Sequence, residues 1–229
     1  MKTNIVMLID RSGSMSNVAK DHTGNIQNLV KEQQKLDEEA TFTLIQFDGQ
    51  APNDVVFDNL NLKDVDIDSY ELYARGSTPL NQALGATIAR IEEQEKKNKS
   101  DKVVFFIVTD GGNTDGSEWT QAQLKEKIEK YKDDWVIIFL GANIDAFSGG
   151  GNYGINVGHT MSFAQNGASV TGAYQLTSGK LFASRKMARG QEAQFAANMC
   201  YTEQDYTTQD EWVDNSVGKT NARASESKS

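Results

Sequence analysis

The sequence predicts an α/β fold, in which helices cover both faces of a doubly wound, mostly parallel central sheet with one antiparallel edge strand. Two apolar runs without alternation, 5–9 and 103–108, are typical of strands buried on both faces. Strands that alternate with helices along a chain build parallel sheets. Partial alternation over 41–47, followed by a short apolar run at 55–57, predicts a strand and its antiparallel edge neighbour.

The remaining elements follow from helical spacing and from further apolar runs. Apolar residues three and four positions apart indicate amphipathic helices that lie on the sheet. Thr120 and Gln123 have the spacing of a capping box, and Pro79 suits the first turn of a helix. Helices are therefore expected over 25–36, 80–91, from 121, over 144–147 and over 169–187, and strands at 135–140 and 159–163.

Domain organisation is expected to be simple. Residues 1–190 hold the alternating pattern and are predicted to form one domain. Residues 191–229 form a polar C-terminal extension. Because residues 220–229 contain no large apolar side chain, at least the last ten residues are expected to be disordered.

Composition excludes several classes of function. The chain has 32 acidic and 23 basic residues, a net charge of -9, which disfavours nonspecific binding to nucleic acid or to an anionic membrane. No apolar run approaches the ~20 residues of a membrane span, and the first core strand leaves no room for a signal peptide. Cys200 is the only cysteine, so neither an intrachain disulfide nor a cysteine zinc cluster is expected. These observations favour a cytoplasmic protein.

A polar loop directly follows the first apolar run. Asp10 ends that run, and Ser12 and Ser14 follow at alternate positions, with Gly13 between them to allow a tight turn. A carboxylate and two hydroxyls are oxygen donors, which suit hard cations such as Mg²⁺, Mn²⁺ or Ca²⁺. One loop cannot fill an octahedral shell, and Thr78 and Asp110, which ends the second apolar run, are candidates for further ligands.

The order of these residues resembles a known family. Asp10-x-Ser12-x-Ser14, then Thr78, then Asp110 after a hydrophobic strand, is similar to the complete metal-ion-dependent adhesion site (MIDAS) of a von Willebrand factor A domain. The resemblance implies that the three hydroxyls contact the ion and that the two carboxylates act directly or through water. It covers about residues 3 to 190, and residues from 141 onward resemble small stand-alone members found in bacteria and their phages.

The leading functional prediction is a metal-dependent adaptor module without enzymatic activity. The cation, Mg²⁺ with Mn²⁺ or Ca²⁺ as alternatives, would be completed by an Asp or Glu of a protein partner. Loops 49–54, 69–77 and 111–117 would select that partner, and Arg75 is a candidate for holding an acidic group of it, against a plain surface salt bridge. The oligomeric state does not follow from the sequence.

Two alternatives belong to other classes. A metal-dependent hydrolase, perhaps a phosphatase, is suggested by Asp10 at a strand end, but the haloacid dehalogenase family needs a second Asp where Ser12 stands. Its base would have to be His22, His159 or a loop aspartate. The other alternative is a structural subunit whose metal only stabilises the fold.

Several polar residues are assigned ordinary structural roles. His22 is expected on a solvent-exposed loop, and His159 is expected to be structural. Asp48 and Asp54 are expected to be turn residues. Cys200 is expected to be partly buried and inert, because no basic group lies near it in sequence.

Overall fold

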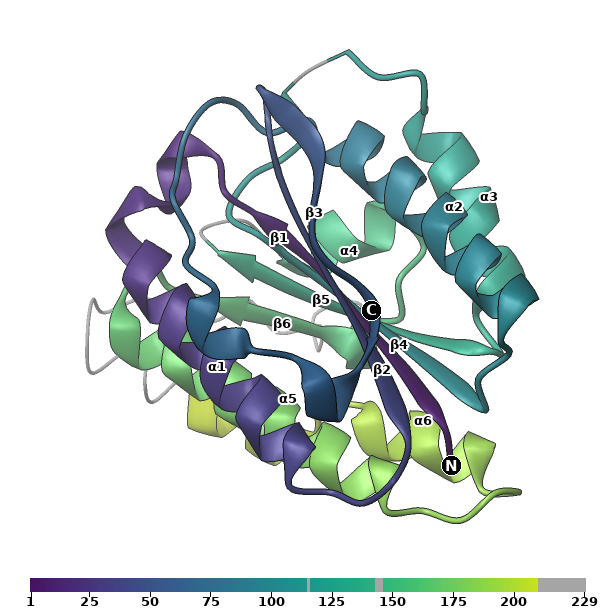
Figure 1. Cartoon of the computed structure of the whole chain (residues 1–229). Coiled ribbons are helices and arrows are strands. Elements are labelled where there is room, and N and C mark those ends of the chain that lie inside the picture. The colour runs from purple at the N-terminus through teal and green to yellow at the C-terminus, as the bar shows by residue number, and fades with distance from the viewer. Residues whose placement is uncertain (115, 143–145, 210–229) are drawn as a thin grey trace, which may run out of the picture.

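The computed structural model describes residues 1–114, 116–142 and 146–209. Within these residues the strands are β1 (Thr3–Asp10), β2 (Ala40–Asp48), β3 (Ala51–Asn61), β4 (Lys102–Thr109), β5 (Trp135–Ala142) and β6 (Thr160–Phe163). They form one six-stranded sheet in the order β3-β2-β1-β4-β5-β6 (Figure 1). Only β3 runs antiparallel, against β2. The predicted doubly wound sheet with one antiparallel edge strand is confirmed.

Helices cover both faces of this sheet. One face carries α1 (Ala19–Gln34), α5 (Gly167–Arg185) and α6 (Glu192–Met199), and the other carries α2 (Leu80–Lys97), α3 (Gln121–Tyr131) and α4 (Ala146–Asn152). Figure 1 shows α1 and α5 side by side, away from α2 and α3. The predicted capping box opens α3, because the Thr120 hydroxyl accepts the Gln123 N–H while the Gln123 side chain accepts the Thr120 N–H.

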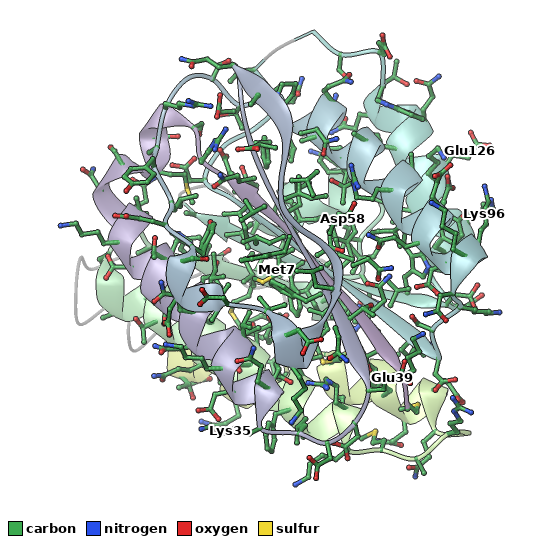
Figure 2. All side chains as sticks on the ribbon, in the orientation of Figure 1. Met7, Lys35, Glu39, Asp58, Lys96 and Glu126 are labelled. Carbon is green, nitrogen blue, oxygen red and sulfur yellow. The ribbon has the colours of Figure 1, made fainter. Side chains whose placement is uncertain are left out.

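Strand β1 shows why its sequence has no alternation. Ile5, Met7 and Ile9 pack in the core beneath α1 and α5, whereas Val6 and Leu8 pack in the core beneath α2 and α3. All five side chains are fully buried, which is the burial expected of a central parallel strand. In Figure 2, Met7 lies at the centre of the molecule.

The first helix begins earlier than its apolar spacing predicts, and this corrects the assignment of His22. A 3₁₀ turn over Gly13–Val18 leads directly into α1, so His22 lies in the helix and not in an exposed loop. Its ring is fully buried, with Nδ1 3.1 Å from the Tyr174 hydroxyl and its edge against Phe163. Burial lowers the pKa of His22 to about 3.

Packing continues beyond residue 190. Phe195 and Met199 of α6 are buried in the core beneath α1 and α5, and Tyr206 joins the same cluster. The compact body therefore includes part of the predicted polar extension 191–229. The sequence does not predict this packing, because apolar residues are sparse in that segment. Residues 220–229, predicted to be disordered, lie outside the described residues.

Candidate metal centre

The sheet topology brings together two loops that lie a hundred residues apart in sequence. Strands β1 and β4 are parallel neighbours, and the order of strands along the sheet reverses between them. Asp10 ends β1, and Asp110 directly follows β4. In doubly wound folds ligands bind at this reversal, at the carboxyl ends of the strands.

Hydrogen bonds join four of the five predicted site residues into one chain. The Ser12 N–H donates to Asp10 Oδ1 over 2.7 Å, and the Ser12 and Ser14 hydroxyl oxygens are 3.0 Å apart. The Ser14 hydroxyl then donates to Asp110 Oδ1 over 2.7 Å. Carboxylates of two strands and hydroxyls of one loop therefore face a common point.

Thr78 joins this group from a third segment, just before α2. Its N–H donates to the Thr114 hydroxyl over 2.9 Å, and its carbonyl accepts the Thr114 N–H over 3.1 Å. The Thr78 hydroxyl oxygen lies 3.9 Å from the position that a Cβ would take on Gly111, the residue after Asp110. All five predicted residues thus lie together at the carboxyl ends of the central strands β1 and β4.

Electrostatics make this group a candidate for a divalent cation. Asp10 is fully buried; burial raises its pKa, and repulsion from Asp110 raises it further, against lowering hydrogen bonds from Thr109 and Ser12. Burial also raises the pKa of Asp110. Two close carboxylates that resist ionisation are stabilised in their charged forms by a nearby cation. The donor set of carboxylates and hydroxyls fits a hard cation.

The sequence reasoning missed two residues that hold the carboxylates in place. The Thr109 hydroxyl donates to Asp10 Oδ2 over 2.6 Å, and Gln165 Nε2 donates to Asp110 Oδ2 over 2.5 Å. A hydroxyl directly before Asp110 was a usable signal for Thr109. Gln165 follows β6, 55 residues beyond Asp110, and only the folded chain brings the two together.

A network of ion pairs holds Arg11, which lies in the loop between Asp10 and Ser12. The Arg11 side chain, which is buried, contacts Asp48 through Nε and Asp54 through Nη1, the latter over 2.8 Å. Arg75 Nε also donates to Asp48, over 3.0 Å. Asp48 accepts the N–H groups of Gln50 and Ala51 as a turn residue, as predicted. The assignment of Asp54 to a turn is wrong, because this residue lies in β3 and pairs with Arg11.

The two histidines and the cysteine lie apart from this chain of hydrogen bonds. His159 Nε2 is 3.2 Å from Cys200 Sγ and 3.2 Å from the Ala196 carbonyl oxygen, a structural arrangement near α6. Burial lowers the pKa of His159 and raises the pKa of Cys200, which is half-buried as expected. Over the described ranges, no group of three or more His, Cys, Asp or Glu side chains is placed to hold a metal. A metal at the candidate centre therefore depends on the hydroxyls.

Comparisons with known proteins agree with this fold. The sequence model of the von Willebrand factor type A domain matches residues 4–152. Proximal thread matrix protein 1 from the mussel byssus is 15% identical, with a TM-score of 0.54 over 76% of this chain and 44% of that one. A von Willebrand factor type A protein from Catenulispora acidiphila is 16% identical, with a TM-score of 0.53 over 86% and 43%. This chain spans less than half the length of either protein.

At 15% and 16% identity, these two proteins show that the fold is shared and no more. One structure of the mussel protein has a zinc-occupied MIDAS motif. Among curated proteins, no sequence matches this chain. None of the helices in the described ranges is long and apolar enough to cross a membrane.

Proposed function

Because this chain belongs to the von Willebrand factor type A domain family, we propose that it is a metal-dependent protein-binding module. The observation that carries the proposal is the chain of hydrogen bonds from Asp10 through Ser12 and Ser14 to Asp110. It brings two carboxylates and two hydroxyls together at the ends of neighbouring strands. Both carboxylates are buried, and a bound cation would offset the cost of burying them.

In this proposal five residues hold one cation. Ser12, Ser14 and Thr78 offer hydroxyl oxygens, and Asp10 and Asp110 offer charge, directly or through water. Both oxygens of Asp10 already accept hydrogen bonds, from the Ser12 N–H and the Thr109 hydroxyl, and both oxygens of Asp110 accept them from Ser14 and Gln165, so either acid can act through a bound water. Five positions filled by these residues, directly or through water, leave one position of an octahedron, which favours Mg²⁺ or Mn²⁺ over the larger shell of Ca²⁺.

An acidic side chain of a partner protein would take the open position. Two carboxylates neutralise a divalent cation, so an incoming carboxylate meets no net negative charge at the ion. Gly13 and Ser14 are exposed, whereas Asp10 is fully buried, so the site is open on the side of this loop. The zinc-occupied motif of the mussel protein supports the general arrangement.

The positions of the histidines support binding without catalysis. A metal-bound water needs a nearby base for hydrolysis. His22 is fully buried against Tyr174, and His159 lies against Cys200 and Ala196. Mg²⁺ as the natural ion and a cytoplasmic location remain predictions from the sequence.

A peptide-display selection tests the proposed function. Random peptides are selected on immobilised protein in Mg²⁺ at about 5 mM, which is enough to saturate a weak metal site. Bound peptides are then eluted with a chelator. We expect every selected peptide to contain Asp or Glu and to lose binding when that residue becomes Asn or Gln. None of these peptides should bind the Asp110→Ala variant. Selected peptides that bind without metal, or that lack an essential acid, would contradict the proposal. A metal that only stabilises the fold would raise the melting temperature and select no peptides.

A further inference from the structure

One loop beside the candidate metal centre exposes an aromatic side chain and part of an arginine whose Nε pairs with Asp48. Residues 70–77 run from the end of a 3₁₀ turn to the segment that holds Thr78. Among the described residues only three large apolar side chains are strongly exposed, and Tyr73 is the most exposed of them, at 67%. Arg75, two residues further on, has 47% of its side chain exposed.

The backbone of this 70–77 loop is fixed against the metal-binding loop. The Arg75 N–H donates to the Arg11 carbonyl over 2.7 Å, and the Gly13 N–H donates to the Gly76 carbonyl over 3.0 Å. These two bonds lie on either side of Ser12. Gly76 has φ 71°, a conformation that side chains rarely adopt, and a Cβ there would be 3.3 Å from the Gly49 nitrogen. The backbone of Arg75 is thus held beside the proposed ion.

The Arg75 side chain is oriented by a buried acid. Its Nε donates to Asp48, which is fully buried and is also paired with Arg11. The structure gives the Nη1 and Nη2 groups of Arg75 no partner within the described residues. A guanidinium held at one nitrogen, with its two Nη groups left to donate, is pre-organised to bind a further carboxylate. Ordering it in advance reduces the entropy lost on binding.

We propose that the partner segment is doubly acidic: one carboxylate completes the metal shell, and a second is held by Arg75, with an apolar side chain against Tyr73. This inference rests on the proposed function. Arg11 and Arg75 share the acids Asp48 and Asp54, so the support for a second acid is the half-exposed Arg75 guanidinium, which these ion pairs hold at Nε alone. Tyr and Arg are also the residue types that contribute most often to binding hot spots.

The geometry of an extended peptide sets the probe. Alternate residues of an extended chain point to the same side and are about 6.6 Å apart. The probe is therefore the peptide acetyl-Leu-Asp-Ala-Asp-Ala-amide, compared with the two peptides in which one Asp or the other is replaced by Asn. Binding to protein loaded with Mn²⁺ is followed by the paramagnetic broadening of the peptide's proton signals, and Mn²⁺ occupancy is measured separately by electron paramagnetic resonance.

The expected result is a coupling between the second acid and Arg75. The diacidic peptide should bind about fivefold more tightly than either monoacidic one, as for a charge-assisted bond at a partly exposed site. In Arg75→Gln this advantage should vanish, while the protein still binds Mn²⁺ at one site, with the occupancy of each variant measured and matched before the peptides are compared. Tyr73→Ala should weaken all three peptides alike, and Glu71→Gln should strengthen the diacidic peptide by removing a like charge. Arg90→Gln is the matched control, because Arg90 is a partly exposed arginine that pairs with Asp58, about 15 Å along α2 from the site.

The outcomes separate the two proposals. Equal binding of the three peptides, or an advantage that survives in Arg75→Gln, overturns the double-acid inference and leaves the metal-dependent function standing. Failure of every peptide to bind the Mn²⁺-loaded protein also overturns the inference. Failure of the protein to bind Mn²⁺ overturns both, because the proposed function then has no metal.

Discussion

Asp48→Asn tests the ion-pair network beneath the site. The substitution keeps the size of the side chain and an oxygen that accepts the N–H groups of Gln50 and Ala51. It removes the negative charge that faces Arg11 and Arg75. Asp48 is fully buried and only 7% of the Arg11 side chain is exposed, so the lost charge leaves a mostly buried guanidinium with one acidic partner, Asp54.

The magnitude follows from burial on each side of the pair. Removing one partner of a buried ion pair costs about 3–5 kcal/mol. The bond to Arg75 contributes little here because nearly half of that side chain is exposed, and Asp54 still pairs with Arg11 at 2.8 Å. We therefore expect a loss of about 2–3 kcal/mol in the free energy of unfolding. With a urea m-value of about 2 kcal/mol/M, the midpoint should fall by roughly 1–1.5 M.

The pH dependence gives a second readout. Burial alone raises the pKa of Asp48, but the hydrogen bonds from Arg75, the Gln50 N–H, Arg11 and the Ala51 N–H outweigh it, so the pKa is lowered from 3.8. A lowered carboxyl pKa stabilises the folded state above the unfolded value and loses that contribution as the pH falls. The difference between wild type and Asp48→Asn should thus be full at pH 7 and shrink below about pH 4.

Urea unfolding followed by circular dichroism at pH 7 and at pH 3 measures both effects. Asp58→Asn is the control, since Asp58 pairs with Arg90 and half of its side chain is exposed. It should shift the midpoint by a few tenths of a molar at most. A midpoint unchanged at pH 7 in Asp48→Asn, or an equal shift at both pH values, would refute this account of Asp48.

Two further predictions concern the fold. Because burial lowers the pKa of His22 from 6.5 to about 3, the protein should lose about 2 kcal/mol between pH 6.5 and pH 5 as the unfolded chain gains a proton, and His22→Gln should lose less; a melting series that gives both the same pH slope would contradict this. In Gly85→Ala the new Cβ would come within 2.3 Å of the Trp119 ring, so we expect a loss of about 1–3 kcal/mol and a shift in tryptophan fluorescence. In Gly24→Ala, where nothing lies within 4 Å, helix propensity should raise stability by about 0.5–1 kcal/mol. Equal effects of the two glycine substitutions in chemical denaturation would show that the close approach of Gly85 to Trp119 does not limit stability.

Local patterns predicted the fold well because burial on both faces leaves a clear record. The unbroken run 5–9 identified the central strand, and the residues after it identified the loop that faces Asp110. Contacts between distant segments were beyond such patterns. Gln165, which follows β6, donates to Asp110, and Arg11, which follows β1, pairs with Asp54 of β3. Neither contact has a periodic or local signal.

His22 shows the other limit of the sequence. A lone histidine before an apolar helical stripe is usually exposed, but α1 begins at Ala19 and turns this ring inward. Its burial depends on Phe163 and Tyr174, which lie more than a hundred residues later in the sequence. The same holds for Phe195 of α6, whose sequence surroundings are polar and whose side chain is fully buried. Tertiary packing decided both positions.

Calorimetric titration of Mn²⁺, and then of Mg²⁺, into chelator-treated protein tests the central claim most directly. The account predicts saturable binding at one site in the wild type, at least about 100-fold weaker binding in Asp110→Ala, and an unchanged circular dichroism spectrum. Asp68→Ala is the control, because Asp68 is an exposed acid in the 3₁₀ turn Ile67–Ser69 and pairs with Lys31 of α1, and this variant should bind Mn²⁺ as the wild type does. Equal Mn²⁺ affinity in the wild type and in Asp110→Ala would contradict the assignment of this metal centre.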